Sequence, residues 1–393
     1  MMNILIQAWS CSPNRGGEFA VSWGWITGLD QKLGNTDKIY VLSRGLEDDD
    51  IMHAGLKHVE LLHVKFPYVF YKIFGESSIT YILWQRYAYQ SARKKGIKFD
   101  IIHVCSLSDF RKPGIWYRFP DAYTIFGPVG GGQRCPHSLI TYDESSHWIR
   151  GLVNNYCRYS PIFRCRIKCY SRCYACNYET AKYLPGAYVL PDVPLNNQLR
   201  ELPIQEKEHD KVRLLYCGRL INKKGLMLLL DIVACMRDQR NWELVIYGDG
   251  EQCEKLRQRI EDLELNEYVF LKGAVPYTEM SRIYGDADIF VLPSLRESGG
   301  SVLIEAMAHG LPIVALNMAL SRILAEQDVG RFVDISGDSE TVKKRFVYAL
   351  KELIDNPALR RELGDKGYKY VNSKLTWDAM LNAVYGEPLN KGR

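Results

Sequence analysis

Long hydrophobic runs are missing from this sequence, although 47% of its 393 residues are hydrophobic. A helix that crosses a bilayer needs about 20 consecutive apolar residues, and no run approaches that length. The first residues enter a strand directly, without a basic and apolar leader, so we expect no signal peptide and a cytoplasmic protein. The hydrophobic fraction excludes a disordered chain and is sufficient for two domains, each with its own core.

A strong excess of charge of one sign is missing too. Lys and Arg together number 51 and Asp and Glu together 46, which gives a formal net charge of +5. This balance is far from that of a nucleic-acid-binding protein, so no nucleic-acid partner is expected, but it is consistent with anionic ligands or an anionic surface. The 11 cysteines, in a chain without an export signal, are expected to be reduced thiols rather than a disulfide framework.

The loop after the first strand lacks the G-x-G-x-x-G spacing of a dinucleotide site, which argues against a dehydrogenase. It reads Cys11-Ser-Pro-Asn-Arg-Gly16-Gly17-Glu18 and precedes a helix expected from about Phe19. Paired glycines allow a backbone to approach a ligand closely. The loop is therefore either in contact with a ligand or a tight turn without a function.

Short β-rich apolar runs alternate with helical patterns along nearly the whole chain, which predicts an α/β fold with largely parallel sheets. The runs form two series, and the polar stretch 203–210 between them is the best candidate for a linker. We therefore expect two Rossmann-like domains, at residues 1–205 and 206–374. The expected strands lie near residues 3–8, 38–42, 59–63, 100–104, 122–126, 212–216, 242–247, 268–271, 288–292, 312–315 and 330–333.

One strand-turn-helix-strand unit, between Asp288 and Ala315, carries the strongest functional signal. Pro293 ends its first strand, and Ser298-Gly299-Gly300-Ser301 supplies a turn and the start of a helix. The first N–H groups of that helix lack partners within it, and the helix dipole favours an anion there. Two carboxylates flank this position, Glu297 on the loop and Glu305 inside the helix, and they suit neutral hydroxyl groups rather than a phosphate.

A basic glycine motif opens the second series of strands. The strand near 212–216 is followed by Gly218-Arg219-Leu-Ile-Asn-Lys-Lys224-Gly225, which places two cations before the start of a helix. The next strand ends at Tyr247-Gly248-Asp-Gly250, a turn typical of a phosphate-facing loop, although this pattern is common. A further strand end carries Lys272-Gly-Ala-Val275. If these motifs had no function, their basic residues would simply lie on solvated loops.

The spacing Glu297-x7-Glu305, framed by Ser-Gly-Gly and by Ala-Met-Ala-x-Gly-x-Pro-Ile-Val, resembles the signature of the retaining nucleotide-sugar glycosyltransferases of family four. The motif from Gly218 to Gly225 is similar to the Gly-Arg-Leu-x-x-x-Lys-Gly motif of that family, and the loop from Cys11 to Glu18 resembles its bacterial polysaccharide branch. The resemblance implies the GT-B fold, with two Rossmann-like domains facing across a cleft. It also implies transfer from a nucleotide diphosphate sugar to a carbohydrate acceptor, with retention at the anomeric carbon.

The resemblance implies roles for individual residues as well. Arg219 and Lys224 would hold the pyrophosphate of the donor together with the N–H groups after Gly299, Glu305 would bind ribose hydroxyls, and Glu297 would contact the sugar. Two fixed cations and helix N–H groups can stabilise a departing diphosphate without a metal ion, and neither a metal nor a cofactor is expected. The residues expected at the donor site are Gly16, Gly17, Gly218, Arg219, Lys224, Gly248, Val275, Glu297, Ser298, Gly299, Gly300, Ser301, Val302 and Glu305.

The sequence departs from the family at Gly127, within Phe126-Gly-Pro-Val-Gly-Gly-Gly132, where many members have a histidine near the transferred sugar. His103, on the preceding strand, is a candidate to replace that histidine. The alternative is a core histidine whose ring nitrogens are satisfied by neighbours. The expected catalytic residues are Glu297, Arg219, Lys224 and His103.

The segment 148–176 contains four cysteines at helical spacing, which predicts one stripe along a helix. A single tetrahedral metal ion needs four ligands that converge on one point, whereas this stripe would extend over three turns. Small apolar cysteines packed in a core are therefore the favoured interpretation. The four are Cys165, Cys169, Cys173 and Cys176.

The same segment has six basic residues, no acidic ones and interleaved aromatics. Such a composition favours an anionic membrane surface. It predicts a peripheral protein on the inner face of the plasma membrane, with a lipid-linked oligosaccharide as the acceptor. The alternative is a basic, solvated helix whose aromatic and cysteine face packs into the core. The basic residues are Arg150, Arg158, Arg164, Arg166, Lys168 and Arg172.

Other functions stay open at this point. The acceptor could be a soluble sugar or another small molecule, or the protein could be a catalytically inactive regulator that binds nucleotide sugars. The missing histidine near Gly127 is the only argument for the regulator, and the two glutamates and two cations argue against it. Beyond Asp338 the pattern is helical, and the last helix, at 375–393, resembles the terminal helix of the family, which crosses back onto the first domain.

Overall fold

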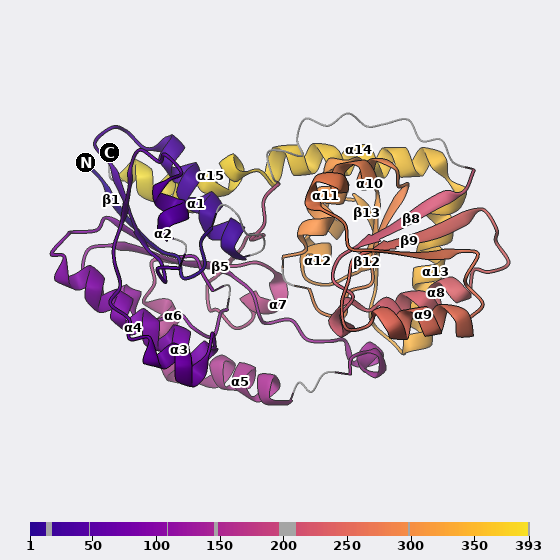
Figure 1. Cartoon of the computed structure of the whole chain (residues 1–393), viewed down its shortest axis with the longest axis horizontal. Coiled ribbons are helices and arrows are strands. Elements are labelled where there is room, and N and C mark those ends of the chain that lie inside the picture. Colours follow the sequence, from indigo (N-terminus) through magenta and orange to yellow (C-terminus); the bar gives the residue numbers. More distant parts are fainter. Residues whose placement is uncertain are drawn as a thin grey trace. The chain divides into compact units, whose positions relative to one another are not determined.

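The computed structural model describes residues 1–12, 18–46, 48–107, 109–144, 148–195, 210–297 and 299–391. The chain divides into two compact units, each built around one sheet (Figure 1). Unit 1 comprises Met1–Gly132, Trp148–Asp192 and Trp377–Arg393, and unit 2 comprises Gln133–His147 and Val193–Thr376. The expected boundary at 205/206 and nearly all of the expected linker lie outside the described residues.

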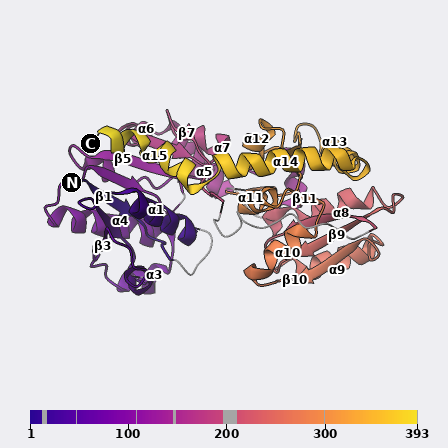
Figure 2. The ribbon, with the colours of Figure 1, turned by 90° about the horizontal axis from the view of Figure 1, so that it is seen from above.

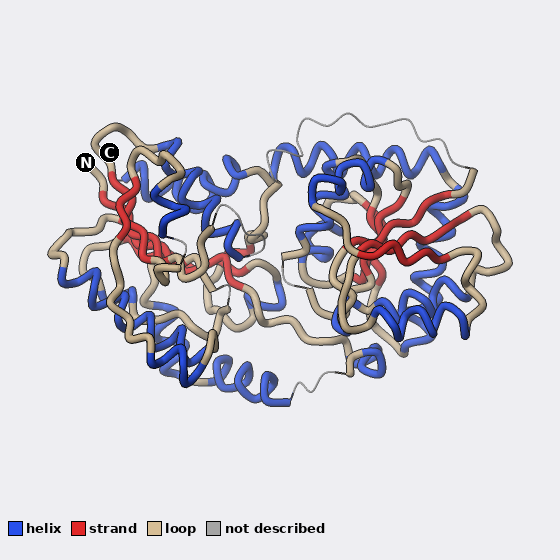
Figure 3. Tube along the Cα trace, in the orientation of Figure 1, coloured by secondary structure: helices blue, strands red, loops and turns tan. Residues whose placement is uncertain are grey.

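Unit 1 contains a parallel sheet of seven strands in the order β3-β2-β1-β4-β5-β6-β7. Its central strands are apolar, and every residue of β4 is buried, as expected for a parallel sheet with helices on both faces (Figure 3). The strands are β1 (Asn3–Gln7), β2 (Lys38–Leu42), β3 (Val59–Leu61), β4 (Ile101–Val104), β5 (Tyr123–Val129), β6 (Arg172–Ala175) and β7 (Tyr188–Val189). The helices are α1 (Glu18–Lys32), α2 (Asp48–Met52), α3 (Val69–Phe74), α4 (Ser78–Lys94), α5 (Trp148–Tyr159), α6 (Pro161–Lys168), α7 (Tyr178–Ala181) and α15 (Trp377–Lys391), with a 3-10 turn at Trp116–Arg118.

Unit 2 contains a parallel sheet of six strands in the order β10-β9-β8-β11-β12-β13. The strands are β8 (Val212–Cys217), β9 (Trp242–Tyr247), β10 (Val269–Gly273), β11 (Ile289–Leu292), β12 (Ile313–Leu316) and β13 (Gly330–Val333). The α-helices are α8 (Leu226–Ala234), α9 (Cys253–Asp262), α10 (Met280–Gly285), α11 (Ser301–Ala308), α12 (Leu320–Ala325), α13 (Ser339–Asp355) and α14 (Pro357–Lys374). Short 3-10 helices lie at His137–Tyr142, Asn222–Lys224 and Tyr277–Glu279.

The predicted α/β fold class, with two parallel-sheet Rossmann-like units, is confirmed. All eleven predicted strands are present, with ends that differ by a few residues. The prediction missed β6 and β7 at one edge of the first sheet. β6 lies inside the segment 148–176, where a continuous helix was expected.

The predicted cysteine stripe is wrong for this reason. Helix α6 ends at Lys168, so Cys165 and Cys169 lie at its exposed end, whereas Cys173 belongs to β6 and Cys176 follows that strand. Cys173 and Cys176 are buried, and Cys165 and Cys169 are exposed. The expectation of core packing therefore holds for one pair only.

The last helix, α15, belongs to unit 1 and packs against α1 (Figure 2). The contact depends on two glycines of α1, because a Cβ at Gly24 would lie 1.8 Å from the ring of Trp377 and a Cβ at Gly28 would lie 2.5 Å from Leu381. The missing side chains of α1 thus make room for those of α15. No helix within the described ranges is both long enough and apolar enough to cross a membrane.

Candidate functional site

The candidate site lies in unit 2, beyond the carboxyl ends of β8, β9 and β11 (Figure 1). β8 pairs with β9 on one side and with β11 on the other, so the order of the strands reverses beside β8. Open parallel sheets bind ligands at such a switch point, outside the carboxyl ends of the strands. The described parts of the loops that meet there, at 218–225, 248–252, 293–297 and 299–300, hold half of the predicted donor-site residues.

Glycines bring the backbones of these loops together. Gly218 and Gly248 have φ angles of +151° and +141°, and a Cβ at Gly248 would lie 1.8 Å from the carbonyl oxygen of Gly218. Gly225 has a φ of +71°, and a Cβ there would lie 2.2 Å from the carbonyl oxygen of Pro293. A side chain at Gly248 or Gly225 would push these loops apart, and the φ of Gly218 is one that other residues rarely adopt. The glycines are therefore needed for the shape of the site.

A cavity of about 290 Å³ is lined by five of the predicted residues. The rest of its described lining is mostly apolar or aromatic, and one carboxylate, that of Glu305, faces it. A mostly apolar cavity with a single carboxylate suits a flat ring system attached to a group with hydroxyls. The five residues are Gly218, Gly248, Val275, Val302 and Glu305, and the others are Cys217, Tyr247, Ala274, Tyr277, Met280 and Tyr284.

Tyrosines hold the carboxylate of Glu305 in place. The hydroxyl of the fully buried Tyr284 donates to Oε2 of Glu305 at 2.9 Å. Burial raises the pKa of Glu305 above its usual value, and hydrogen bonds from Tyr284 and Tyr277 offset part of that effect. The carboxylate is thus fixed on α11, and it can accept further hydrogen bonds from a ligand.

Lys224 and Glu297 form an ion pair, and Ser294 donates to the same carboxylate oxygen at 3.2 Å. The side chains of Lys224 and Glu297 are only 13% and 14% exposed. The backbone joins the same two loops, because the N–H of Leu295 donates to the carbonyl of Lys223 at 2.9 Å. The basic motif and the Glu297 loop therefore behave as one structural element.

Four cationic side chains gather at this element. Burial lowers the pKa of Lys223, and the nearby Arg219, Lys224 and Arg296 lower it further, whereas Glu297 raises it. Arg219 is exposed at the end of its strand. Such a concentration of positive charge favours an anionic ligand. Sequence reasoning missed Lys223 and Arg296, although each lies next to a residue that it selected.

Helix α11 begins beside these cations. Its N-cap is Gly300 in a left-handed conformation, with a φ of +61°, and this residue has no side chain with which to cap the first N–H groups of the helix. Those N–H groups are of the kind that bind phosphate oxygens. Gly299 and Ser301 lie on either side of this N-cap, as predicted. Ser298 lies outside the described residues, as do Gly16 and Gly17.

A segment from the first half of the chain also contributes to this site. We call residues 133–144 the strap, and the structure assigns it to unit 2. The amide of Asn222 donates to the carbonyl of Tyr142 at 2.8 Å and accepts from the N–H of Glu144 at 2.9 Å. The fully buried carboxylate of Asp143 pairs with Arg296 at 3.2 Å. The strap thus holds both the basic loop and the Glu297 loop, and no pattern in the sequence indicated this.

Two further contacts attach the strap to the body of unit 2. Tyr142 donates to Asp231 of α8 at 2.7 Å, and Ser138 donates to the carbonyl of Ile335 at 2.9 Å. The exposed side chain of Glu144 pairs with Lys255 of α9 at 2.9 Å. These contacts fix the strap at several points along its length. Contacts on both sides of Asp143 therefore hold its carboxylate beside Arg296.

The structure corrects the expectation for His103. Its ring is fully buried on β4, Nε2 donates to the carbonyl of Gly127, and Nδ1 accepts from the hydroxyl of Tyr385. A carbonyl can only accept, so Nε2 carries the proton of a neutral ring. Burial lowers the pKa of His103 to about 4. Both nitrogens are occupied, so this is a core histidine with no free atom for a sugar.

Position 127 itself leaves no space for a side chain. Gly127 has a φ of +102°, and a Cβ there would lie 2.2 Å from the carbonyl oxygen of Tyr174 on β6. A histidine at this position would collide with the neighbouring strand. The packing of β5 against β6 therefore requires glycine at position 127, where many members of the family have histidine.

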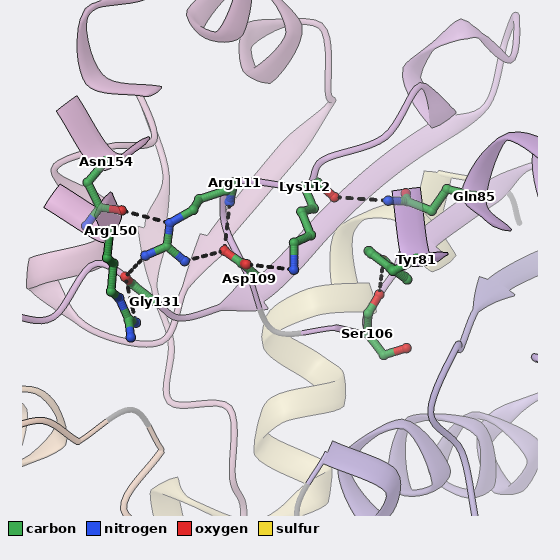
Figure 4. A network of polar contacts seen from close by, with 9 residues as sticks. All are labelled: Tyr81, Gln85, Ser106, Asp109, Arg111, Lys112, Gly131, Arg150 and Asn154. Carbon is green, nitrogen blue, oxygen red and sulfur yellow. Dashed lines mark hydrogen bonds and ion pairs between the residues drawn. The ribbon is translucent and has the colours of Figure 1, made fainter. Parts of the chain in front are cut away.

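The loops beyond the sheet of unit 1 are joined by a polar network (Figure 4). Arg111 contacts Asp109 at 2.8 Å, the carbonyl of Gly131 at 2.6 Å and the side chain of Asn154 on α5 at 2.8 Å. Lys112 pairs with Asp109 at 3.0 Å. Burial would raise the pKa of Asp109, but Lys112 and Arg111 outweigh it and hold that pKa below its usual value. The network connects the ends of β4 and β5 to α5.

Two parallel Rossmann-like units with a loop site at the switch point are characteristic of the GT-B fold, and the comparisons agree. The chain resembles the lipopolysaccharide outer core galactosyltransferase WaaB over 98% of its length and all of WaaB, with a TM-score of 0.66 and 16% identity. It resembles Anabaena HepE in complex with UDP over the full length of both chains, with a TM-score of 0.64 and 15% identity. These likenesses establish the fold.

In sequence, residues 198–370 match the family described as Glycosyl transferases group 1. The chain is 32% identical over 148 residues to the amylovoran biosynthesis glycosyltransferase AmsK of Erwinia amylovora, which covers 36% of each protein. The match to the D-inositol 3-phosphate glycosyltransferase of Corynebacterium glutamicum, at 29% identity, covers 51% of that protein, so the chain spans about half the length or less of these relatives. The sequence similarity is thus concentrated in unit 2, where the candidate site lies.

Proposed function

We propose that this protein is a glycosyltransferase that moves a sugar from a nucleotide diphosphate sugar to an acceptor, with retention at the anomeric carbon. The observation that carries the proposal is the position of Glu305. Its carboxylate faces a mostly apolar cavity at the strand ends that also carry Arg219 and Lys224. Such an arrangement fits a nucleoside followed by a diphosphate. HepE, which has the same fold, is described in complex with UDP.

Each part of the donor has a counterpart in this arrangement. The base would lie against Val275 and Tyr247, and the ribose hydroxyls would donate to Glu305. The diphosphate would lie between Arg219, Lys224 and the first N–H groups of α11, which stabilise the charge that develops as it departs. No metal ion is required by this mechanism, because the cations are supplied by the chain.

The ion pair between Lys224 and Glu297 suggests how binding of the diphosphate could affect the contacts of the sugar. When Lys224 turns to the diphosphate, the carboxylate of Glu297 would exchange this ion pair for hydrogen bonds from sugar hydroxyls. The leaving diphosphate and the incoming acceptor would then occupy the same face of the sugar, which gives retention. Glu297 acts by orienting the sugar in this proposal.

We also propose that the acceptor is a lipid-linked oligosaccharide and that the protein works on the cytoplasmic face of the plasma membrane. Helix α5 supports this location, because it buries Asn154 and Cys157 and exposes the apolar residues of its other side. Tyr156 and Tyr159 are 63% and 70% exposed, so these two aromatic side chains do not face the core, whereas Phe163, Tyr170 and Tyr174 further along the segment are buried. This inverted pattern suits a headgroup layer better than water. The relative AmsK is named for polysaccharide biosynthesis.

Incubation with a panel of nucleotide sugars tests the proposal. We expect one donor to be hydrolysed slowly without an acceptor, which releases a nucleoside diphosphate that a coupled assay can measure. Binding of a nucleotide sugar without hydrolysis or transfer to any acceptor would favour the inactive regulator. Transfer to a soluble sugar with full efficiency would favour a soluble acceptor.

A further inference from the structure

The α3 helix of unit 1 is unusual because none of its six residues is buried. Several apolar residues of α3 and of the first turns of α4 face outward instead. Tyr68, just before α3, is 70% exposed, and Ile73 is 64% exposed. We call this region the α3–α4 corner. Its exposed apolar side chains are Tyr68, Val69, Ile73, Phe74, Ile79 and Ile82.

The corner is not explained by the packing of unit 1. A helix of six residues is too short to be stable by itself in water, and the outward residues of α3 add nothing to the core. Tyr71 and Phe66 pack against the core and hold the corner in place. The remaining apolar side chains of the corner are exposed within a short stretch of chain, and such a concentration of exposed apolar residues marks a contact surface.

A second outward apolar face lies on α5 and the start of α6. Ile149, Leu152, Val153 and Tyr156 have the i, i+3, i+4, i+7 spacing of one helix face, and all are exposed. Figure 1 shows α3 and α5 on the same lower edge of unit 1, and Figure 2 shows that they are separated in depth. They are therefore two separate contact points on one side of the unit.

The charges around both faces have the sign that anionic lipid requires. The segment 148–176 has six basic residues and no acidic ones. Lys65 and Lys72 lie beside the corner, where Lys72 is placed over the ring of Tyr68. Glu76, the acid between α3 and α4 in the sequence, pairs with Arg44 at 3.0 Å. Outward apolar and aromatic residues among cations are the pattern of a protein that lies in the headgroup layer.

We infer that the α3–α4 corner is a second membrane anchor, which inserts into an anionic bilayer together with the outward face of α5. Two separated anchors fix the tilt of unit 1 on the membrane, whereas α5 alone would leave the unit free to rock. The inference extends the proposed location of the enzyme. It does not depend on which sugar is transferred.

The test uses the full-length protein and flotation with vesicles of phosphatidylcholine and phosphatidylglycerol. The variant Ile73→Ser/Phe74→Ser should bind these vesicles about tenfold more weakly than the wild type, because two apolar side chains no longer enter the bilayer. Tyr348→Ser, which changes a side chain that is 71% exposed on α13 of unit 2, is the matched control and should bind as the wild type does. Circular dichroism confirms that each variant is folded.

Three outcomes would overturn the inference. If the corner variant binds as tightly as the wild type while replacement of Arg158, Arg164, Arg166 and Lys168 by Glu releases the protein, α5 is the only anchor. If the wild type does not bind anionic vesicles at low salt, both anchors are rejected. If the corner variant instead lowers the mass measured by light scattering, the corner joins two copies of this chain. Donor hydrolysis, measured on the same samples, separates each of these results from a failure of the proposed activity.

Discussion

The two units share the order of their first four strands, but the loops beyond these strands differ in kind. In unit 2 they are joined by close glycine backbones, and they leave a cavity with Glu305 on its wall. In unit 1 side chains such as Arg111 and Asp109 join them, and the unusual apolar residues lie on outer helices. The same strand order therefore supports loops of two kinds, and the residues on these loops determine whether they leave a cavity or join one another through polar side chains. Four experiments test this contrast.

The largest effect is expected when a basic side chain proposed to bind the diphosphate is removed from unit 2. Arg219→Ala or Lys224→Ala should each lower turnover by about two orders of magnitude or more, because each variant lacks a fixed positive charge that would stabilise the departing diphosphate. Turnover is measured with the donor identified in the hydrolysis panel. Lys344→Ala, an exposed cation on α13, is the control and should retain full activity. Near-normal rates in both site variants would refute the assignment of the diphosphate.

The next effect separates the two glutamates. Glu305→Gln should weaken binding of the nucleoside diphosphate by about tenfold or more, because a charged acceptor for ribose hydroxyls is lost. Glu297→Gln should mainly slow transfer, with similar affinity for the same nucleoside diphosphate. Calorimetric titration with UDP and with other nucleoside diphosphates distinguishes the two variants. Equal losses of affinity in both would contradict the division of roles.

The strap provides an effect of intermediate size. Asp143→Asn removes the charge that pairs with Arg296, so we expect turnover to fall by about tenfold as the Glu297 loop loses its support. The neighbouring Glu144→Gln, whose partner Lys255 is exposed, is the matched control and should have little effect. Recovery of turnover in Asp143→Glu would indicate positioning by charge. If Asp143→Asn and Glu144→Gln behave alike, the strap does not position the loop.

The smallest effect is on the stability of unit 1. The pKa of His103 is about 4 in the folded protein against an ordinary value of 6.5 in the unfolded chain, so the unfolded chain takes up the proton first as the pH falls. The contribution of His103 to the free energy of unfolding is complete at a pH above its pKa in the unfolded chain. This contribution is lost as the pH falls towards its pKa in the folded protein. Lowering the pH from 7.5 to 5.5 should cost about 1 kcal/mol through this group. Denaturant unfolding of the wild type and of His103→Gln measures it, and equal pH dependence in both would contradict the account.

Much of unit 2 could be predicted because its signals are local. The motif from Gly218 to Gly225 and the unit from Asp288 to Ala315 each place a strand, a turn and a helix start within a few residues. The structure brings Glu305, Val275 and Gly248 to one cavity, as the order of the strands requires. Residues next to motif positions, such as Lys223, were missed because the motif specifies only certain positions and leaves those between them open.

Some failures come from local patterns that fit two structures, and others from contacts between distant segments. β6 was missed because Arg172–Ala175 is short and its cysteine continues a spacing that also fits a helix. The ring nitrogens of His103 are satisfied by Tyr385, which lies 282 residues further along the chain, so no local pattern could reveal their partners. The exposure of Ile73 was equally hidden, since an apolar residue in a short helix is normally buried.

The strap has a consequence for the order in which the protein can mature during synthesis. Asp143 leaves the ribosome before any strand of unit 2, so it must wait for Arg296, which is 153 residues later, before the Glu297 loop can take its final form. A fragment that begins at Val193 would contain the donor motifs at 218–225 and 297–305 and would lack this partner. Adding a separate peptide that spans the strap should then restore what the fragment lost, so the site can be assembled from two pieces.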